Sequence, residues 1–375
     1  MVTGTDGKHV TVRFDSGKVR SFEHAPAKQP GKLVPREHLM HTDAQGRKVG
    51  VSHTTLPDGR QMTTRLTPEG TGSSVHLSAK EPNTDEVFTV TGMNSSGHVM
   101  VRRESRFPGE KDPSMVSTYG VNDVRDMGGD FGAAGKALLP ARNLLLAQEE
   151  QMAKDHLTSI YGDQAHIDPG VQSGRAAMML SWHVPDALHQ RLAKSGFQIH
   201  AVDGPITDVL TDLKGQHSPA HDVTSPAGIT WDQVTGVMDP NSKQVVIGMD
   251  ARPGTAQHEA AHALDVTAAS AIGGGHASDV GGFREAFRMA SRSKALYPYY
   301  RQRSADSGTA ENAGRMEFFA ESFSTWLRRR EDSAAERQRR MSVALAGGKP
   351  GAPKINGMAA LDSYYTWLYD RLTSG

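Results

Sequence analysis

The sequence His258-Glu259-Ala260-Ala261-His262 constrains this 375-residue chain more than any other feature. Residues four apart lie on the same face of a helix, so the two imidazoles can bind one metal ion. The carboxylate of Glu259 can reach a water molecule on that ion. This HExxH arrangement is typical of zinc peptidases, in which the metal lowers the pKa of its water towards about 7 and the glutamate takes the proton. A chance match is the alternative, because the chain contains 17 histidines.

The residues around this motif favour a metal site over a chance match. The segments AGITWDQVTGVMD and KQVVIGMD alternate like two strands and flank the turn sequence Asp-Pro-Asn-Ser. The following AQHEAAHALDVTAASA has no internal glycine or proline and predicts a helix, for which Thr255 is the expected N-cap. The motif is therefore expected on a helix that directly follows a strand.

A catalytic zinc ion needs a third protein ligand besides the two histidines. The chain has no cysteine, so this ligand has to be a histidine or a carboxylate. Ala268 occupies the position, six residues after the second histidine, at which one peptidase class carries a third histidine. His276 is a weaker candidate in a glycine-rich loop, and Glu317 and Glu321 lie four apart in the apolar segment MEFFAESFSTWL. Carboxylates on a core-facing helix require a partner, which favours these glutamates.

The segments HEAAHALD and EFFAESF together resemble the catalytic domain of anthrax toxin lethal factor and its relatives, which include the clostridial Pro-Pro endopeptidases. The strands before the motif are similar as well, and the resemblance covers roughly residues 175–375. It implies a gluzincin-type zinc endopeptidase in which His258, His262 and Glu317 bind Zn²⁺ and Glu259 is the general base. It further implies that Glu321 orients a histidine ligand, a role that Asp265 is also placed to take.

One position departs from the family pattern. The family carries an oxyanion-stabilising tyrosine seven residues before the ligand glutamate, and this position is Ala310 here. Tyr300 is the candidate replacement, on condition that its loop folds back to the site. The family's geometry also implies a protein or peptide substrate that lies extended along an edge strand near GITWDQVTGVM, by β-augmentation.

The pattern along the chain predicts an α+β fold with an N-terminal antiparallel β-domain. Alternating runs separated by Asp-Ser-Gly, Asp-Gly and Asn-Ser-Ser-Gly turns indicate β-hairpins over residues 1–127, a β-rich accessory or delivery domain. Residues 128–139 are rich in glycine and alanine and are expected to form a linker. Residues 140–375 are expected to form a mostly helical, zincin-type metallopeptidase domain with a small sheet.

Composition and the N-terminal sequence narrow the class of protein further. The 42 basic and 42 acidic residues balance, which argues against a general nucleic-acid binder. No apolar run reaches the 18 or so residues of a membrane span, and the N-terminus lacks a Sec-type signal peptide. With the resemblance, this predicts a bacterial toxin or effector that is secreted by another route, for delivery into a target cell. A secretion chaperone or an immunity protein is an expected partner. The alternative is a non-catalytic binding module on a zincin fold, with the β-domain carrying the interaction.

Overall fold

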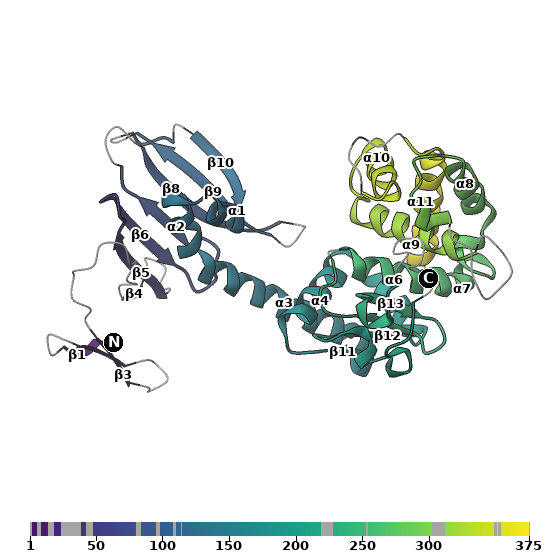
Figure 1. Ribbon diagram of the computed structural model, residues 1–375, viewed down its shortest axis with the longest axis horizontal. Coiled ribbons are helices and arrows are strands. Elements are labelled where there is room, and N and C mark those ends of the chain that lie inside the picture. The colour runs from purple at the N-terminus through teal and green to yellow at the C-terminus, as the bar shows by residue number, and fades with distance from the viewer. Residues whose placement is uncertain are drawn as a thin grey trace. The chain divides into compact units, whose positions relative to one another are not determined.

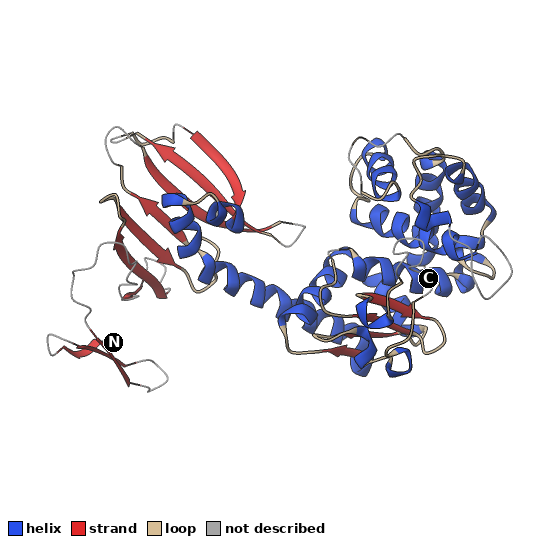
Figure 2. Ribbon diagram, viewed as in Figure 1, coloured by secondary structure: helices blue, strands red, loops and turns tan. Residues whose placement is uncertain are grey.

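The computed structural model of the chain is α+β, as the sequence predicts (Figures 1 and 2). It divides into two compact units, Met1–Leu146 and Ala147–Gly375. The structure describes residues 2–5, 9–13, 19–23, 39–42, 48–79, 84–94, 98–107, 110–113, 115–218, 228–252, 254–301, 312–348, 351 and 354–374. Ala310, the position of the family tyrosine, lies outside these residues.

The first unit is built on antiparallel sheets. Among its described residues, one sheet has three strands in the order β1-β2-β3, and the other has seven in the order β10-β9-β8-β7-β6-β5-β4. The hairpins expected from the turn sequences are β2–β3, β5–β6 and β8–β9. The strands are β1 (Val2–Thr5), β2 (His9–Arg13), β3 (Val19–Glu23), β4 (Leu39–Thr42), β5 (Lys48–Thr55), β6 (Gln61–Leu66), β7 (Ser74–Leu77), β8 (Asp85–Met93), β9 (Val99–Arg106) and β10 (Met115–Gly120).

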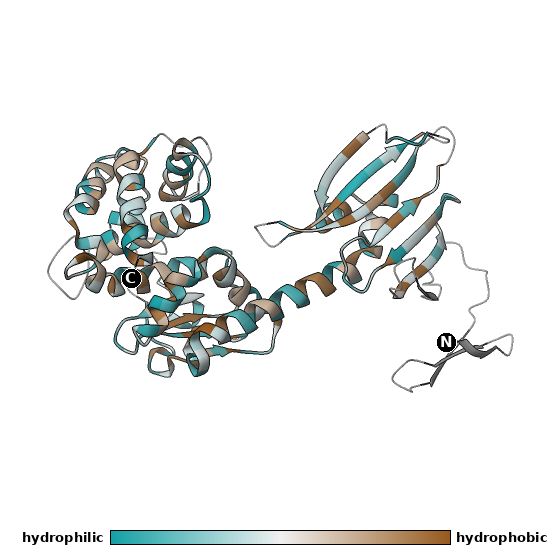
Figure 3. Cartoon of the chain, turned by 180° about the vertical axis from the view of Figure 1, so that it is seen from behind, coloured by the Kyte–Doolittle hydropathy of each residue, from teal (hydrophilic) through white to brown (hydrophobic). Residues whose placement is uncertain are grey.

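Alternation along these strands creates one buried face. Along β8, for example, Phe88 and Val90 are buried while Val87 and Thr89 are partly exposed, and Figure 3 shows the same alternation of apolar and hydrophilic residues along the larger sheet. Helices α1 (Val121–Asp126) and α2 (Gly129–Ala137) and the start of α3 (Leu139–Tyr161) cover this face. The core of the unit lies between them and the sheet.

The segment 128–139 is not the linker that its composition predicted. Most of it is helix α2, and Ala134 and Leu138 are fully buried in the core of the first unit. Its glycines serve close packing instead of flexibility, because a Cβ on Gly135 would collide with the backbone of Arg125 in α1. The boundary between the units falls later, within α3. In that helix Leu145 and Leu157 are buried as expected, but Met152 is exposed.

The second unit combines a small mixed sheet with a mostly helical remainder. Its four strands lie in the order β11-β12-β14-β13, and β13 is an edge strand antiparallel to β14. Helices α4 and α6 pack against the sheet, and α9 packs against α6. The elements are β11 (Ala165–Ile167), α4 (Val171–His183), α5 (Asp186–Lys194), β12 (Gln198–Ala201), β13 (Gly236–Asp239), β14 (Gln244–Ile247), α6 (Thr255–Thr267), α7 (Ala269–Ile272), α8 (Gly281–Ser291), α9 (Asn312–Arg328), α10 (Ala334–Leu345) and α11 (Met358–Thr373).

An aromatic core fixes α9 in this unit. The fully buried rings of Phe318, Phe319 and Phe323 on α9 pack against Phe283 of α8 and Tyr365 of α11, with several ring centroids 5.0–6.2 Å apart. The opposite side of α9 faces α6. No helix among the described residues is long and apolar enough to cross a membrane.

Candidate metal centre

Helix α6 carries the HExxH residues and begins at a glycine. Gly254, and not Thr255, is the N-cap; its φ of +129° is accessible to glycine at little cost. A Cβ there would also lie 3.0 Å from a guanidinium nitrogen of Arg328 at the end of α9. This turn directs the chain from β14 into α6, so that His258 and His262 face α9.

The two histidines and Glu317 bring three possible ligand atoms together. Nε2 of His258 lies 3.2 Å from Nε2 of His262 and 3.0 Å from Oε2 of Glu317, and Nε2 of His262 lies 3.4 Å from the same carboxylate oxygen. Ligand atoms about 2.0–2.1 Å from a tetrahedral ion lie roughly 3.3 Å from one another. The separations and the donor types therefore fit a metal ion held by His258, His262 and Glu317.

Glu321 lies on the other side of His258. One of its carboxylate oxygens is 3.3 Å from Nδ1 of His258, while Nε2 of the same ring faces Glu317. A carboxylate on Nδ1 fixes the ring orientation and makes Nε2 a better ligand. This is the orienting position that the sequence analysis expected for Glu321.

Glu259 lies beside the cluster in a buried position and against β13. The backbone N–H of Met238 donates a hydrogen bond to its carboxylate, and burial raises the pKa of Glu259 above its usual range. Gly236 provides the space: a Cβ there would collide with Thr255 and approach Cγ of Glu259 to 3.1 Å. The edge strand and the carboxylate of Glu259 are thus in direct contact.

Asp265 and His276 lie beside each other and outside the set of three ligand atoms. The buried carboxylate of Asp265 accepts hydrogen bonds from the backbone N–H and the hydroxyl of Ser278, at 2.7 and 2.8 Å. Nδ1 of His276 is 4.0 Å from the same carboxylate. Asp265 therefore anchors the loop after α7, and among the described contacts it accepts no hydrogen bond from His262.

Of the tyrosines before α9, Tyr299 reaches the site, whereas the sequence suggested Tyr300. The hydroxyl of Tyr299 hydrogen-bonds Glu317, and burial raises the pKa of Tyr299, which keeps it protonated. Tyr300, the candidate from the sequence, is buried with its ring against Tyr297 and Phe318, at centroid distances of 6.2 and 6.3 Å. Sequence alone could not select among three tyrosines within four residues, because only the fold of this short segment decides which hydroxyl reaches Glu317.

No protein-family model matches the sequence, and no curated protein matches it.

The charge state of His258 makes metal binding dependent on pH. Burial alone would lower the pKa of His258, but the hydrogen bonds to Glu317 and Glu321 raise it well above its usual value. Because a ligand histidine must be neutral, metal uptake near pH 7 is expected to release about one proton. The apparent affinity should rise up to about tenfold per pH unit while His258 is protonated in the metal-free protein.

Calorimetric titration of zinc in buffers of different ionisation enthalpy measures this proton release. Equal apparent enthalpies in all buffers at pH 7 would show that no proton leaves, which would contradict the expected charge state.

Proposed function

We propose that the unit Ala147–Gly375 is a zinc-dependent endopeptidase. The observation that carries the proposal is the meeting of two histidines from α6 with Glu317 from α9, with the buried carboxylate of Glu259 beside them. Two imidazoles and one carboxylate are a ligand set of catalytic zinc sites, which keep a further position open for water or substrate. When bound, zinc acts as a Lewis acid towards a peptide carbonyl and activates a water molecule.

The protein's own residues supply the proton transfers. Glu259 accepts a proton from the attacking water at its carboxylate and later gives it to the leaving amine. The raised pKa of Glu259 makes its carboxylate a stronger base, and a pKa closer to the working pH suits a group that both accepts and donates a proton. Glu321 keeps the ring of His258 in one orientation throughout.

Strand β13 provides a place for an extended substrate. It forms the edge of the four-stranded sheet and pairs on one side with β14. A peptide that adds to the free edge as a further strand would run past Glu259, since Gly236 and Met238 of β13 both contact that residue. The proposed substrate class is therefore an extended segment of a protein.

The proposal assigns the oxyanion donor to Tyr299. Its protonated hydroxyl lies at Glu317, and a donor at this position can stabilise the charge that develops on the carbonyl oxygen. Tyr299→Phe is expected to lower kcat about 10²–10³-fold with unchanged zinc content. Tyr300→Phe is the matched control and should stay within about twofold, because the Tyr300 hydroxyl has no hydrogen bond among the described residues. If Tyr300→Phe lowered the rate of peptide cleavage more than Tyr299→Phe, the oxyanion donor would be Tyr300.

A measurement of zinc content together with cleavage of a peptide library, with and without a chelator, tests the function itself. The proposal predicts about one zinc per chain, cleavage that the chelator abolishes and restoration of cleavage by added zinc. Zinc binding without cleavage of any peptide or protein would favour the non-catalytic binding module.

A further inference from the structure

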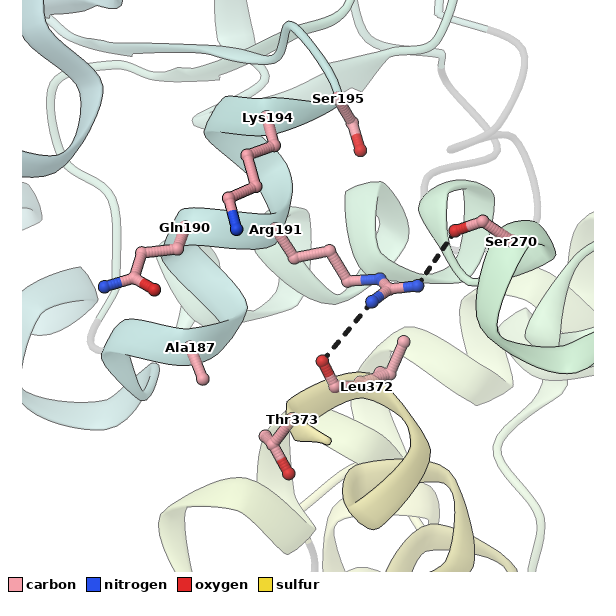
Figure 4. Close-up of a pocket in the computed structure, with 8 residues that line it drawn as sticks. All are labelled: Ala187, Gln190, Arg191, Lys194, Ser195, Ser270, Leu372 and Thr373. Atoms are coloured by element: carbon pink, nitrogen blue, oxygen red, sulfur yellow. Dashed lines mark hydrogen bonds between the residues drawn. The ribbon is translucent and has the colours of Figure 1, made fainter. Parts of the chain in front are cut away.

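A second site lies away from the metal centre and is independent of the proposed function. A cavity of about 230 Å³ opens between the end of α5, helix α7 and the end of α11 (Figure 4). None of the residues that line it is acidic, and two are cationic, Arg191 and Lys194. Three residues with hydroxyl groups also line it, Ser195, Ser270 and Thr373, together with Ala187, Gln190 and Leu372.

The guanidinium of Arg191 donates two hydrogen bonds to the protein, but its Nε donates none within the described part of the chain. It donates to the hydroxyl of Ser270 at 2.9 Å and to the backbone carbonyl of Leu372 at 3.4 Å, as Figure 4 shows. Its Nε is buried and has no hydrogen-bond partner. A buried, charged donor without a partner is costly, so an acceptor at this position would be stabilising.

Lys194 adds a second charge that the fold does not neutralise. Its ammonium has no hydrogen bond or ion pair among the residues that the structure describes, and the same holds for the hydroxyl of Ser195. Lys243 lies close by and donates to the carbonyl of Ser195 at 3.0 Å, which adds to the positive potential at the rim. Arg191 and Lys243 satisfy backbone carbonyls at the ends of α11 and α5, whereas the exposed ammonium of Lys194 satisfies none among the described residues.

We propose that this cavity binds a small phosphate-bearing anion. A phosphate monoester carries a charge of about −1.5 to −2 at pH 7, whereas a carboxylate carries only −1. Two cations therefore neutralise a phosphate more evenly than a carboxylate. Arginine and lysine are both established phosphate ligands, and hydroxyls supply further donors. The volume is below the roughly 300–1,000 Å³ of sites for larger organic ligands, which favours a small molecule or a single phosphate group.

Calorimetric titration of the full chain with inorganic phosphate, at constant ionic strength and in the presence of a chelator, tests the proposal. The chelator removes binding of phosphate to a metal. Saturable binding is expected, and Lys194→Ala should weaken it about tenfold. Lys294→Ala, which removes another exposed lysine that does not line the cavity, should leave it unchanged. Absence of binding, or equal binding by the Lys194→Ala protein, would overturn the proposal.

Two further ligands are compared with inorganic phosphate: glycerol 3-phosphate tests for a phosphorylated metabolite, and acetate tests the preference for phosphate over a carboxylate. Glycerol 3-phosphate that binds more tightly than inorganic phosphate would support a phosphorylated metabolite, whereas equal affinities would support recognition of the phosphate group alone. Acetate that binds as tightly as phosphate would contradict the preference for a phosphate. None of these results depends on peptidase activity, so the site and the proposed function fail or succeed separately.

Discussion

Glu259→Gln is expected to bind zinc as the unaltered protein does and to cleave its substrate about 10²–10⁴-fold more slowly. Glutamine keeps the size of the side chain and an acceptor for the Met238 N–H, so β13 and α6 should remain in contact. It cannot take a proton from water. The loss should therefore fall on kcat, since the substrate-binding edge of β13 is unchanged.

Cleavage rates and zinc content, measured on the same preparation, check this expectation. Glu285→Gln is the matched control, because this exposed glutamate on α8 pairs only with Arg288 among the contacts described here. Glu259→Ala should also lose cleavage and retain zinc. Retained cleavage by either Glu259 variant would refute the assignment of the general base.

The second large effect is expected at Glu317. Glu317→Ala removes one of three ligand atoms and should lower zinc affinity by more than the roughly 10–100-fold expected for Glu321→Ala, which removes only the carboxylate that orients His258. Cleavage should be lost with the metal. In the unaltered protein, burial alone would raise the pKa of Glu317, but His262 and His258 lower it well below its usual value, so this carboxylate is ionised and ready to bind a cation.

Competition with a zinc-chelating dye gives the two affinities. Glu336→Ala, at an exposed glutamate of α10 that pairs with Arg339 and Arg340, is the control and should bind zinc normally. If Glu321→Ala weakened zinc binding more than Glu317→Ala, the roles of the two glutamates would have to be exchanged.

Local patterns in the sequence predicted the parts of the site that depend on spacing. Two histidines four apart share a helix face, and the apolar neighbours of Glu317 and Glu321 placed these carboxylates on a core-facing helix. The choice of Glu317 over Glu321 came from the resemblance, and in the structure Glu317 approaches both histidines while Glu321 approaches only His258.

What the sequence did not predict depends on tertiary packing. Gly129–Ala137 has the composition of a linker, yet its glycines allow α2 to lie against the backbone of α1. The N-cap of α6 is Gly254, which has a positive φ. The sequence predicted Thr255 instead, because threonine is a common N-cap residue. The cavity at Arg191 joins three helices distant in sequence, and no local motif marks it.

The proposed function depends on one zinc ion that His258, His262 and Glu317 bind together. Anomalous diffraction from a crystal of the zinc-loaded protein, recorded on both sides of the zinc absorption edge, tests this claim most directly. We expect one strong peak about 2.0–2.2 Å from Nε2 of both histidines and from a carboxylate oxygen of Glu317. A peak elsewhere, or a zinc ion that Glu317 does not contact, would contradict it.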